Sequence, residues 1–470
     1  MNVIYPNKNQ NWLLPLSIMD MIPEDHICFL VEEFAENLDY TNFDIQYDGA
    51  GHPAYHPRII MKIIIQGMLS RIRSSRKLSA SCRENFVMMY LAEKANPDFR
   101  TIARFRKNNA HFIKDTFRKT VEIASEKKLI DLSFISLDGS KIKAYSSRKR
   151  YFNKIALDKL DKAIDKMIEE DIELDEVEEE LFGDKEEGLT GIDKKDLKNI
   201  VREFNKSKDK NKIKKNIQKA KKEIKETGQK KISLTDPESR MMKTAKSYTE
   251  PSYNAQLSVS RNHIIISNDV CQDGHDVHQF IPQVRNIKEN VKLNKNTKIG
   301  LDCGYSDGEN IKFAEDEEID LYVPSRAQAQ EFDGKEQSLN HDKYEYDEEK
   351  DELIVGRHRF YFKYAYTRKN GKKILMYYND RLKKKKDVPF YFRERLRMKE
   401  KMNAKESRLI YGLRKITVEP VIGNIKQNIG LREFLLRGLD NVKIEMNIAC
   451  IAHNLMKIWR LSAAKINFLF

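Results

Sequence analysis

The sequence lacks the features of disulfide-rich, cysteine-zinc and membrane proteins. Its five cysteines are scattered and form no C-x-x-C pair, which argues against a disulfide framework and a cysteine-rich zinc site and fits a reducing cytoplasm. The start, MNVIYPNKNQNWLLPLS, has no basic stretch followed by an apolar core, so no signal peptide is expected. No apolar run approaches the roughly 18–20 residues of a membrane span. We therefore predict a cytoplasmic protein without a membrane partner.

Positive charge is in excess. The 470 residues include 86 Lys and Arg against 72 Asp and Glu, a net charge of +14. Such an excess favours a polyanionic partner, because Lys and Arg neutralise phosphates and release their counterions. A merely basic soluble protein is the alternative that charge alone leaves open. The 40% hydrophobic share suffices for at least one large core, and the length allows roughly two to four domains.

The first 130 residues have a helical pattern. One helix is expected to open at Pro57, a second to span RKLSASCRENFVMMYLAE, and a third to start within NPDFRTIARFRKNN. Because successive helical residues turn by about 100°, the third helix has a basic face of Arg100, Arg104 and Lys107 and an apolar face of Phe99, Ile102, Ala103 and Phe105. A helix-turn-helix-like DNA reader fits this pattern, and so does a solvated amphipathic helix.

Residues 151–232 change from acidic to strongly basic, with sparse apolar residues at helical spacing. We predict a charged helical insertion, either an antiparallel hairpin with acid facing base or a partly disordered arm. A solvated insertion is the favoured interpretation, and contact of its basic half with DNA is the alternative.

From residue 233 the pattern becomes mixed and β-rich. SYNAQLSVSRNHIIISNDV predicts two strands joined by a turn at 261–263, and TKIGLDCGYSDGENIKFA predicts a strand, a turn and a helix. DLYVP is a further short strand. An Asn-Gly turn at 370–371 predicts a hairpin, and the chain returns to helix from about 390.

Two carboxylates, Asp138 and Asp302, share a context. Each ends an apolar β-type run, FISLD and KIGLD, and a glycine follows within two residues, Gly139 and Gly304. The carboxyl end of a strand stands at the sheet edge where open α/β sheets place their sites, and a nearby glycine allows close approach. One such acid is usually a turn or cap residue, but two of them in a basic chain suggest a shared metal site.

A third acid, Glu419, lies in the helical segment YGLRKITVEPVIGNIKQNIG. We expect Pro420 to lie near a helix start or at a kink. Gly423 and Lys426 follow on the stripe of Glu419, and apolar residues fill the other side. This pattern suits a metal ligand at Glu419, space for a nearby backbone at Gly423 and a phosphate-binding cation at Lys426. The alternative, a solvent-facing amphipathic helix, gives no reason for the glycine.

Three carboxylates can hold two divalent ions that act on phosphodiesters. Mg²⁺ prefers oxygen ligands and keeps several waters, so few protein ligands suffice. Nearby cations, including Lys141 and Lys143 after Asp138, would then position phosphates.

Most of the chain resembles bacterial insertion-sequence transposases of the DDE type, whose catalytic domain is like RNase H. The motifs that carry the likeness are HPRIIMKIIIQGMLSRIRSSRKLSASCREN with PDFRTIARFRK, LDGSKIKA, LTDPESRMMK with SYNAQLSV, DCGYSDGENI, and TVEPVIGNIKQNIGLREFLLRGLDNVKIEMNIACIAHNLMKI. The resemblance implies an α/β fold: an N-terminal all-helical DNA-binding domain (1–130), an RNase H-like mixed-sheet catalytic domain (131–150 plus 233–470), the charged helical insertion (151–232) and a β-hairpin-rich sub-insertion (335–388).

The resemblance also implies site residues. Asp138, Asp302 and Glu419 would bind catalytic Mg²⁺, for which Mn²⁺ can substitute, and Tyr411, Arg414 and Lys426 match a tyrosine–arginine–glutamate–lysine signature. Four residues rather than three separate Arg414 from Glu419, so Lys415 is an alternative to the arginine. Relatives often carry a cysteine-containing knuckle where this chain has no cysteine between 340 and 380; a β-hairpin and no zinc are expected there.

Two other groups resemble ligands or bases. Asp273, His275, Asp276 and His278 would suit a metal, but the strand before them and Gly274 between them favour a loop with a structural role. His453 lies in an apolar helical stretch and is interpreted as a core residue.

The predicted function is therefore that of a transposase, which binds the terminal inverted repeats of its element, hydrolyses phosphodiesters there and joins the 3′-ends to target DNA. Its partner is double-stranded DNA, and a homodimer is expected in the complex because two transposon ends must meet. A non-catalytic DNA-binding descendant and a metal-dependent nuclease without strand transfer are the alternatives.

Overall fold

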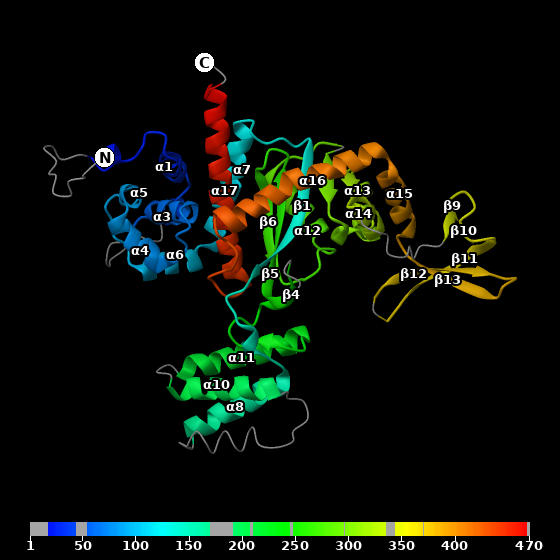
Figure 1. Cartoon of the computed structure of the whole chain (residues 1–470), viewed down its shortest axis with the longest axis horizontal. Coiled ribbons are helices and arrows are strands. Elements are labelled where there is room, and N and C mark those ends of the chain that lie inside the picture. Colours follow the sequence, from blue (N-terminus) through cyan, green and yellow to red (C-terminus); the bar gives the residue numbers. More distant parts are fainter. Residues whose placement is uncertain are drawn as a thin grey trace, which may run out of the picture. The chain divides into compact units, whose positions relative to one another are not determined.

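This computed structural model describes residues 17–43, 54–169, 191–206, 210–244, 248–295, 297–334, 344–369 and 371–467. The chain divides into two compact units, Met1–Lys119 with Ile451–Phe470 and Thr120–Cys450. The four domains and insertions that the sequence predicts divide the chain more finely than these two units, and their limits stay predictions. The fold class is confirmed: a helical N-terminal region precedes a mixed α/β sheet (Figure 1).

The N-terminal unit is helical, and Pro57 occupies the first position of α3 as predicted. The second predicted helix is two helices, because Asn85 between them is extended and its side chain accepts a hydrogen bond from the Met88 N–H at 3.1 Å. The elements are η1 (Met19–Met21), α1 (Cys28–Glu36), α3 (Pro57–Leu69), α4 (Ser75–Glu84), α5 (Phe86–Leu91), α6 (Phe99–Asn108) and α7 (Ala110–Glu126), whose later residues pass into the second unit.

Helix α6 has the predicted basic face, since Arg100, Arg104 and Lys107 are all exposed. The predicted apolar face needs correction at Ala103, which is also exposed. Its place is taken by Arg106, a buried cation that donates hydrogen bonds to the Arg73 carbonyl oxygen at 3.0 Å and to the Ser75 hydroxyl. Pattern reasoning could not find Arg106, because the carbonyl that satisfies it comes from a distant turn.

A second buried cation, Lys62, joins three parts of the N-terminal unit. Its side chain is fully buried on α3, and its ammonium lies 2.6 Å from Glu36 of α1, 2.9 Å from Glu93 after α5 and 3.9 Å from Glu32. Arg58, one turn earlier, pairs with Glu36 and Glu93 as well. Buried charges are tolerated only when paired in this way.

In the second unit, a six-stranded mixed sheet holds the strands on which the candidate site is built. β5 pairs antiparallel with β1, β6 and β4, whereas β1, β7 and β8 run parallel, in the order β5-β1-β7-β8. The strands are β1 (Phe134–Lys143), β4 (Arg240–Lys243), β5 (Thr249–Ser260), β6 (Ile265–Cys271), β7 (Lys298–Leu301) and β8 (Asp320–Tyr322). The predicted turn at 261–263 lies between β5 and β6, and His263 adopts a positive φ of 71° there.

Helices cover both faces of this sheet. Ser258 of β5 donates to Gln283 of α12 (Phe280–Asn290), and Ser258 pairs with Leu137 of β1, so α12 lies on the Leu137 side. Arg414 of α16 (Lys405–Gly423) reaches the next residue, Asp138, whose side chain points to the opposite face. The other elements are η3 (Cys303–Tyr305), α13 (Gly308–Asp316), α14 (Arg326–Phe332), α15 (Phe392–Asn403), the π-helical η4 (Asn424–Asn428) and α17 (Leu439–Asn467).

The motif LTDPESRMMK holds the start of α17. The Asp236 carboxylate accepts hydrogen bonds from the Gly438 N–H at 3.1 Å and the Tyr253 hydroxyl at 2.9 Å, and Glu238 accepts from the Leu439 N–H at 2.6 Å. Acids at a helix N-terminus satisfy its free N–H groups and its dipole. Burial raises the pKa of Asp236 to about 6.

The insertion forms helices with a core of their own. The short strands β2 (Tyr151–Phe152) and β3 (Ile232–Ser233) pair at its base, and it contains α8 (Lys154–Glu169), α10 (Gly191–Lys206) and α11 (Lys210–Thr227). The predicted facing of acid and base is confirmed between α8 and α11, where Lys221 lies 2.9 Å from Asp161 and 2.8 Å from Asp158. Acidic residues 170–190 lie outside the described residues.

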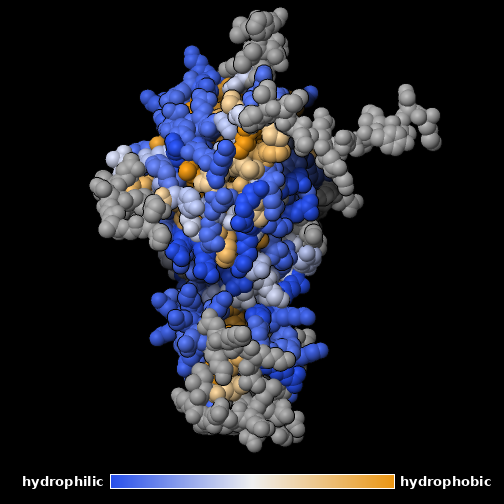
Figure 2. All heavy atoms as spheres, turned by 90° about the vertical axis from the view of Figure 1, so that its left-hand side faces the viewer, coloured by the Kyte–Doolittle hydropathy of each residue, from blue (hydrophilic) through white to orange (hydrophobic). Residues whose placement is uncertain are grey.

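The charged surface of the insertion encloses an apolar core that is shared by α8, α10 and α11. The insertion is thus a three-helix unit and not the expected two-helix hairpin or partly disordered arm. In the lower part of Figure 2, which is the insertion, most of the coloured side chains are hydrophilic. The core includes Leu157, Leu160, Ile164, Leu197, Val201, Phe204 and Ile217.

The predicted hairpin region is a five-stranded antiparallel sheet in the order β13-β12-β11-β10-β9. One face packs Leu353, Phe360 and Tyr377 against Phe392 of α15. The strands are β9 (Glu345–Asp347), β10 (Glu352–Val355), β11 (His358–Thr367), β12 (Lys373–Asn379) and β13 (Lys384–Pro389). Asn370 of the predicted turn lies outside the described residues, and Gly371 has the positive φ of 80° that such a turn requires. Among the described residues, no helix has the length and hydrophobicity to span a membrane.

Replacement of Lys62 by Met should destabilise the N-terminal unit. The change removes the hydrogen bonds that the buried ammonium donates to Glu36 and Glu93. Because both glutamates are partly exposed and keep Arg58 as a partner, the expected loss is about 1.5 kcal/mol. Hydrogen exchange of the α3 amides in the full chain should show a lowered opening free energy. The exposed Lys77→Met is the matched control, and equal protection in the two variants would contradict the role of Lys62.

Candidate active site

Asp138 and Asp302 are neighbours on adjacent parallel strands. The last register pair of β1 and β7 is Leu137 with Leu301, so the two aspartates occupy the next positions along the two chains. Residues opposite each other on neighbouring strands point to the same face of the sheet. The two carboxylates therefore share the face that α16 covers, although 163 intervening residues separate them in the sequence.

The strand that carries Asp138 does not end there, and this corrects the prediction. β1 continues to Lys143 and pairs with β5 from Ile135 to its end, whereas β7 stops at Leu301. Asp138 is thus the first residue of β1 beyond its pairing with β7. The apolar run ends at this point because the strand leaves the middle of the sheet, not because the strand stops.

Glu419 reaches the same face from α16 through Arg414. The Arg414 guanidinium donates to the Asp138 carboxylate at 3.1 Å and to the Glu419 carboxylate at 3.3 Å. Only 10% of the Arg414 side chain is exposed, against 51% for Glu419. Tyr411, one turn before Arg414, is buried with its ring 5.8 Å from the guanidinium, and burial raises the pKa of its hydroxyl to about 12.

Lys415 does not replace the arginine in this arrangement. Its side chain is more than half exposed, and its ammonium lies 2.9 Å from Asp333, at the end of α14. The extra residue between Arg414 and Glu419 is thus accommodated with Arg414, not Lys415, in contact with the acids.

Asp138 has the electrostatics of a crowded acid. Burial raises the pKa of its carboxyl to about 7, with further increases from Asp302 and Asp276, while Arg414 and the Gly139 N–H oppose the shift. The main cause is burial, which disfavours the charged form of the carboxyl, and Arg414 offsets only part of this effect. This carboxylate position would therefore favour an additional cation.

Pro420 lies inside α16. Of the two expected positions, a helix start or a kink, the helix start is therefore wrong. The helix continues for three more residues to Gly423 and passes into η4. A proline has no N–H, so the Ile416 carbonyl one turn earlier loses its helical partner. His263, from the turn between β5 and β6, lies 2.8 Å from that oxygen through Nε2. The turn thus helps to hold α16 against the sheet beside Glu419.

Lys426 lies within the π-helical η4. The α-helical spacing that would place it on the same face as Glu419 therefore ends at Gly423. The Lys426 ammonium donates to the backbone carbonyl of Lys141 at 3.2 Å, and burial lowers its pKa. A methyl group at Gly423 would meet no atom within 4 Å, so the space beside it is open.

Lys141 and Lys143 are three and five residues from Asp138 on a regular strand, and they point to the opposite face. The Lys141 ammonium lies 3.0 Å from Asp276, and that of Lys143 lies 2.9 Å from Glu433. The prediction that both surround Asp138 therefore placed them on the wrong side of β1.

Asp276, from the predicted loop before α12, has a larger structural role than its sequence context suggested. Its Oδ1 accepts hydrogen bonds from Asn254 at 2.7 Å, Gln256 at 2.8 Å and Lys141 at 3.0 Å. A methyl group at Gly139 would lie 2.3 Å from this oxygen. Gly139 thus gives clearance to Asp276. The neighbouring His275 and His278 are exposed.

The chemistry of the three acids fits a hard divalent ion, because all three offer carboxylate oxygens. Within the described part of the chain, no three His, Cys, Asp or Glu side chains are arranged to hold a metal ion. Arg414 lies between Asp138 and Glu419 instead. The three acids could bind an ion together only if Glu419 moved from Arg414 toward the aspartates.

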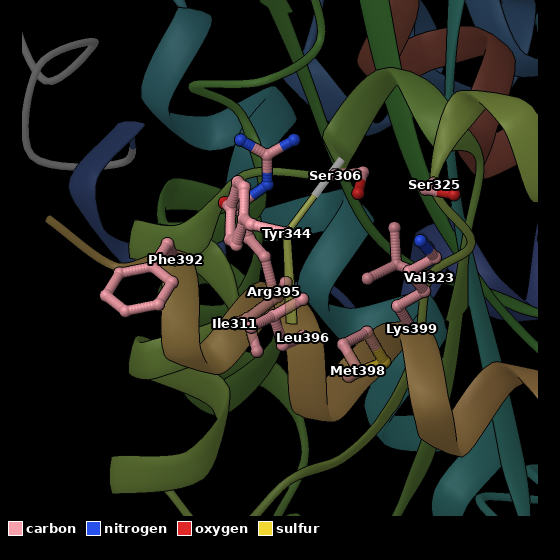
Figure 3. Close-up of a pocket in the computed structure, with 10 residues that line it drawn as sticks. All are labelled: Ser306, Ile311, Val323, Ser325, Tyr344, Phe392, Arg395, Leu396, Met398 and Lys399. Atoms are coloured by element: carbon pink, nitrogen blue, oxygen red, sulfur yellow. The ribbon is translucent and has the colours of Figure 1, made fainter. Parts of the chain in front are cut away.

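A small cavity between α15 and the loops after β7 and β8 is too small for a substrate. It measures about 30 Å³, room for a water molecule or two. Ser306 and Ser325, from the loops after β7 and β8, line one side, and Leu396 and Met398 of α15 line the other (Figure 3).

Comparison with protein families matches both ends of the chain. Residues 16–108 match a transposase domain (DUF772), and residues 379–459 match a transposase DDE domain that includes Arg414, Glu419 and Lys426. No curated protein matches the chain significantly, and no solved structure does. The two matches place transposase domains at both ends of the chain and support its resemblance to DDE transposases of the insertion-sequence type.

Alanine substitutions at Arg414 and at Lys415 should show which of the two cations supports DNA cleavage. Arg414→Ala should lower DNA cleavage about 100-fold, because loss of its contacts misplaces Asp138 and Glu419, while Lys415→Ala should stay within about twofold. Initial cleavage rates on an end-containing duplex measure both. The reverse order would mean that Lys415 is the functional cation.

Gly139→Ala should destabilise the second unit by about 1–3 kcal/mol, because its methyl group must displace Asp276 or Gln256. Thermal unfolding of the full chain measures the change. Gly412→Ala on exposed α16 surface, where a methyl group meets nothing within 4 Å, should be neutral or stabilising. An unfolding midpoint for Gly139→Ala equal to that of the wild type would contradict the clearance role.

Proposed function

We propose that this transposase binds the terminal inverted repeats of an insertion sequence, hydrolyses phosphodiesters there and joins the freed 3′-ends to target DNA. The observation that carries the proposal is the position of the three acids. Two of them directly follow Leu137 and Leu301, the last register pair of β1 and β7, and Arg414 connects the third to the first.

We assign Asp138, Asp302 and Glu419 as the ligands of catalytic Mg²⁺, with Mn²⁺ as a substitute. Two such ions, when bound, activate a water or a 3′-hydroxyl and stabilise the leaving oxygen. The strand order, with β1 between an antiparallel β5 and a parallel β7, supports the RNase H-like architecture that the resemblance implies.

The protein's own groups would position the acids and the DNA. Arg414 holds Asp138 and Glu419 in the same small region and neutralises part of their charge. Buried Tyr411 supports Arg414, and Lys426 is the lysine that we assign to the phosphate next to the cut. Lys141 and Lys143 face the other side of β1 and are left out of this assignment.

Recognition of the repeats is assigned to the N-terminal unit. The exposed basic face of α6, with Arg100, Arg104 and Lys107, is suited to phosphate and groove contacts. Two transposon ends must be held together for transfer, so a homodimer on DNA is part of the proposal.

Alanine at Asp138, Asp302 or Glu419 should abolish cleavage and leave DNA binding nearly unchanged. The loss should exceed the 10–100-fold change that is typical for residues that only support metal ligands. Cleavage of a labelled repeat-end duplex in Mg²⁺ and its binding in EDTA measure the two properties, with Asp316→Ala, an exposed acid on α13, as the control.

The outcomes separate the proposal from its alternatives. A Glu419→Ala variant that cuts at the wild-type rate would show the assignment to be wrong. A wild-type protein that binds ends but never cuts would be a non-catalytic descendant. Cleavage without any joined product would identify a nuclease.

A further inference from the structure

The hairpins β11–β13 form a strongly basic segment of the second unit (Figure 1). Between residues 357 and 389 the sequence has twelve Lys or Arg residues and two acidic residues, Asp380 and Asp387. Asp387 accepts hydrogen bonds from Tyr366 and Arg368. The basic residues are Arg357, Arg359, Lys363, Arg368, Lys369, Lys372, Lys373, Arg381 and Lys383–Lys386. Such a density of one charge makes a polyanion the matching partner.

The two faces of this sheet differ. The inner face packs Phe360, Leu375 and Tyr377 against α15, although Phe362, which pairs with Tyr377 on the same face, is 42% exposed. The outer face carries tyrosines on the two middle strands: Tyr361, Tyr364, Tyr366 and Tyr378. Tyr361 is 45% exposed and Tyr364 is 54% exposed, although aromatic side chains of this size usually contribute to a core.

A β-bulge brings the two exposed tyrosines to one face. Tyr361 pairs with Tyr378 and Tyr364 pairs with Met376, two residues apart on β12, while Lys363 falls in the irregularity between them. On a regular strand, residues three apart would point to opposite faces. The extra residue therefore aligns both tyrosines and leaves Lys363 beside them, with its ammonium 5.9 Å from the Tyr378 ring centre.

We propose that this tyrosine face binds single-stranded DNA, with bases stacked on Tyr361 and Tyr364 and phosphates held by Lys363 and by Lys385, which pairs with Tyr378. Exposed aromatic rings within a basic sheet are the elements of such platforms, because every base offers a π-face. The bases of an intact duplex are stacked on one another and do not present their faces to a flat sheet. An unpaired strand is therefore the ligand that uses both the rings and the charge.

The choice of DNA rests on the proposed function. Cutting at the end of a transposon releases strands with frayed or unpaired nucleotides, and these would be the occupants. The stacking itself does not depend on cleavage, so it can be tested without metal.

The test is binding of the full chain to a fluorescently labelled oligonucleotide of about twelve nucleotides in EDTA. The double variant Tyr361→Ala, Tyr364→Ala should weaken single-strand binding roughly 5- to 150-fold per stacked base. The variant Tyr361→Phe, Tyr364→Phe should bind within about twofold of the wild type, because it keeps the rings. Tyr248→Ala, which removes a tyrosine of 40% exposure elsewhere in the unit, is the control.

A 2-aminopurine in the strand should lose fluorescence with the wild type and the Phe variant but not with the Ala variant. Equal single-strand binding by the Ala variant and the wild type would overturn the proposal. A loss that is as large for a duplex, or tighter binding of RNA of the same sequence, would assign the face to a different ligand and would also overturn it. A Glu419→Ala protein that still cuts would refute the proposed catalytic assignment and leave this result intact.

Discussion

The contact of the Arg414 guanidinium with Asp138 and Glu419 is the interaction on which the rest of the site depends. Three carboxylates at one sheet edge repel one another, and burial makes the repulsion at Asp138 stronger. Arg414 supplies the positive charge that lets α16 pack over β1 with its own acid nearby. Pro420 leaves the Ile416 carbonyl without a helical partner, and the contact of the His263 ring with this carbonyl is a second attachment of the same helix to the sheet. The register of β1 and β7 thus fixes the positions of Asp138 and Asp302, and the contact with Arg414 fixes that of Glu419.

Much of the fold follows from local signals in the sequence. The start of α3 at Pro57, the turn between β5 and β6, and the strand, turn and helix around Asp302 all agree with their patterns. Buried Lys62 and Arg106 could not be predicted in this way, because the groups that satisfy them come from other helices and turns. The break at Asn85 was available in the sequence, since Asn is a favoured helix cap.

The candidate site was predictable in its acids and less so in its cations. Aspartates after apolar runs mark strand positions at a sheet edge, and the register of β1 and β7 places two of them together. The apolar run before Asp138 predicts that the strand ends there, which would leave Lys141 and Lys143 in a loop near the carboxylate. The strand continues instead, and its alternation directs both lysines to the other face of the sheet. Asp276 was undervalued for a related reason: its partners Asn254 and Gln256 come from β5, and no local pattern connects them to the loop before α12.

The central claim is that Asp138, Asp302 and Glu419 bind the same pair of divalent ions during catalysis. Anomalous diffraction from a Mn²⁺ complex with repeat-end DNA tests it most directly. The account predicts two manganese peaks about 3.5–4 Å apart, with oxygens of all three acids as ligands and Glu419 released from Arg414. Manganese bound only to the aspartates, with Glu419 still paired to Arg414 in a complex that cleaves its DNA, would contradict the account.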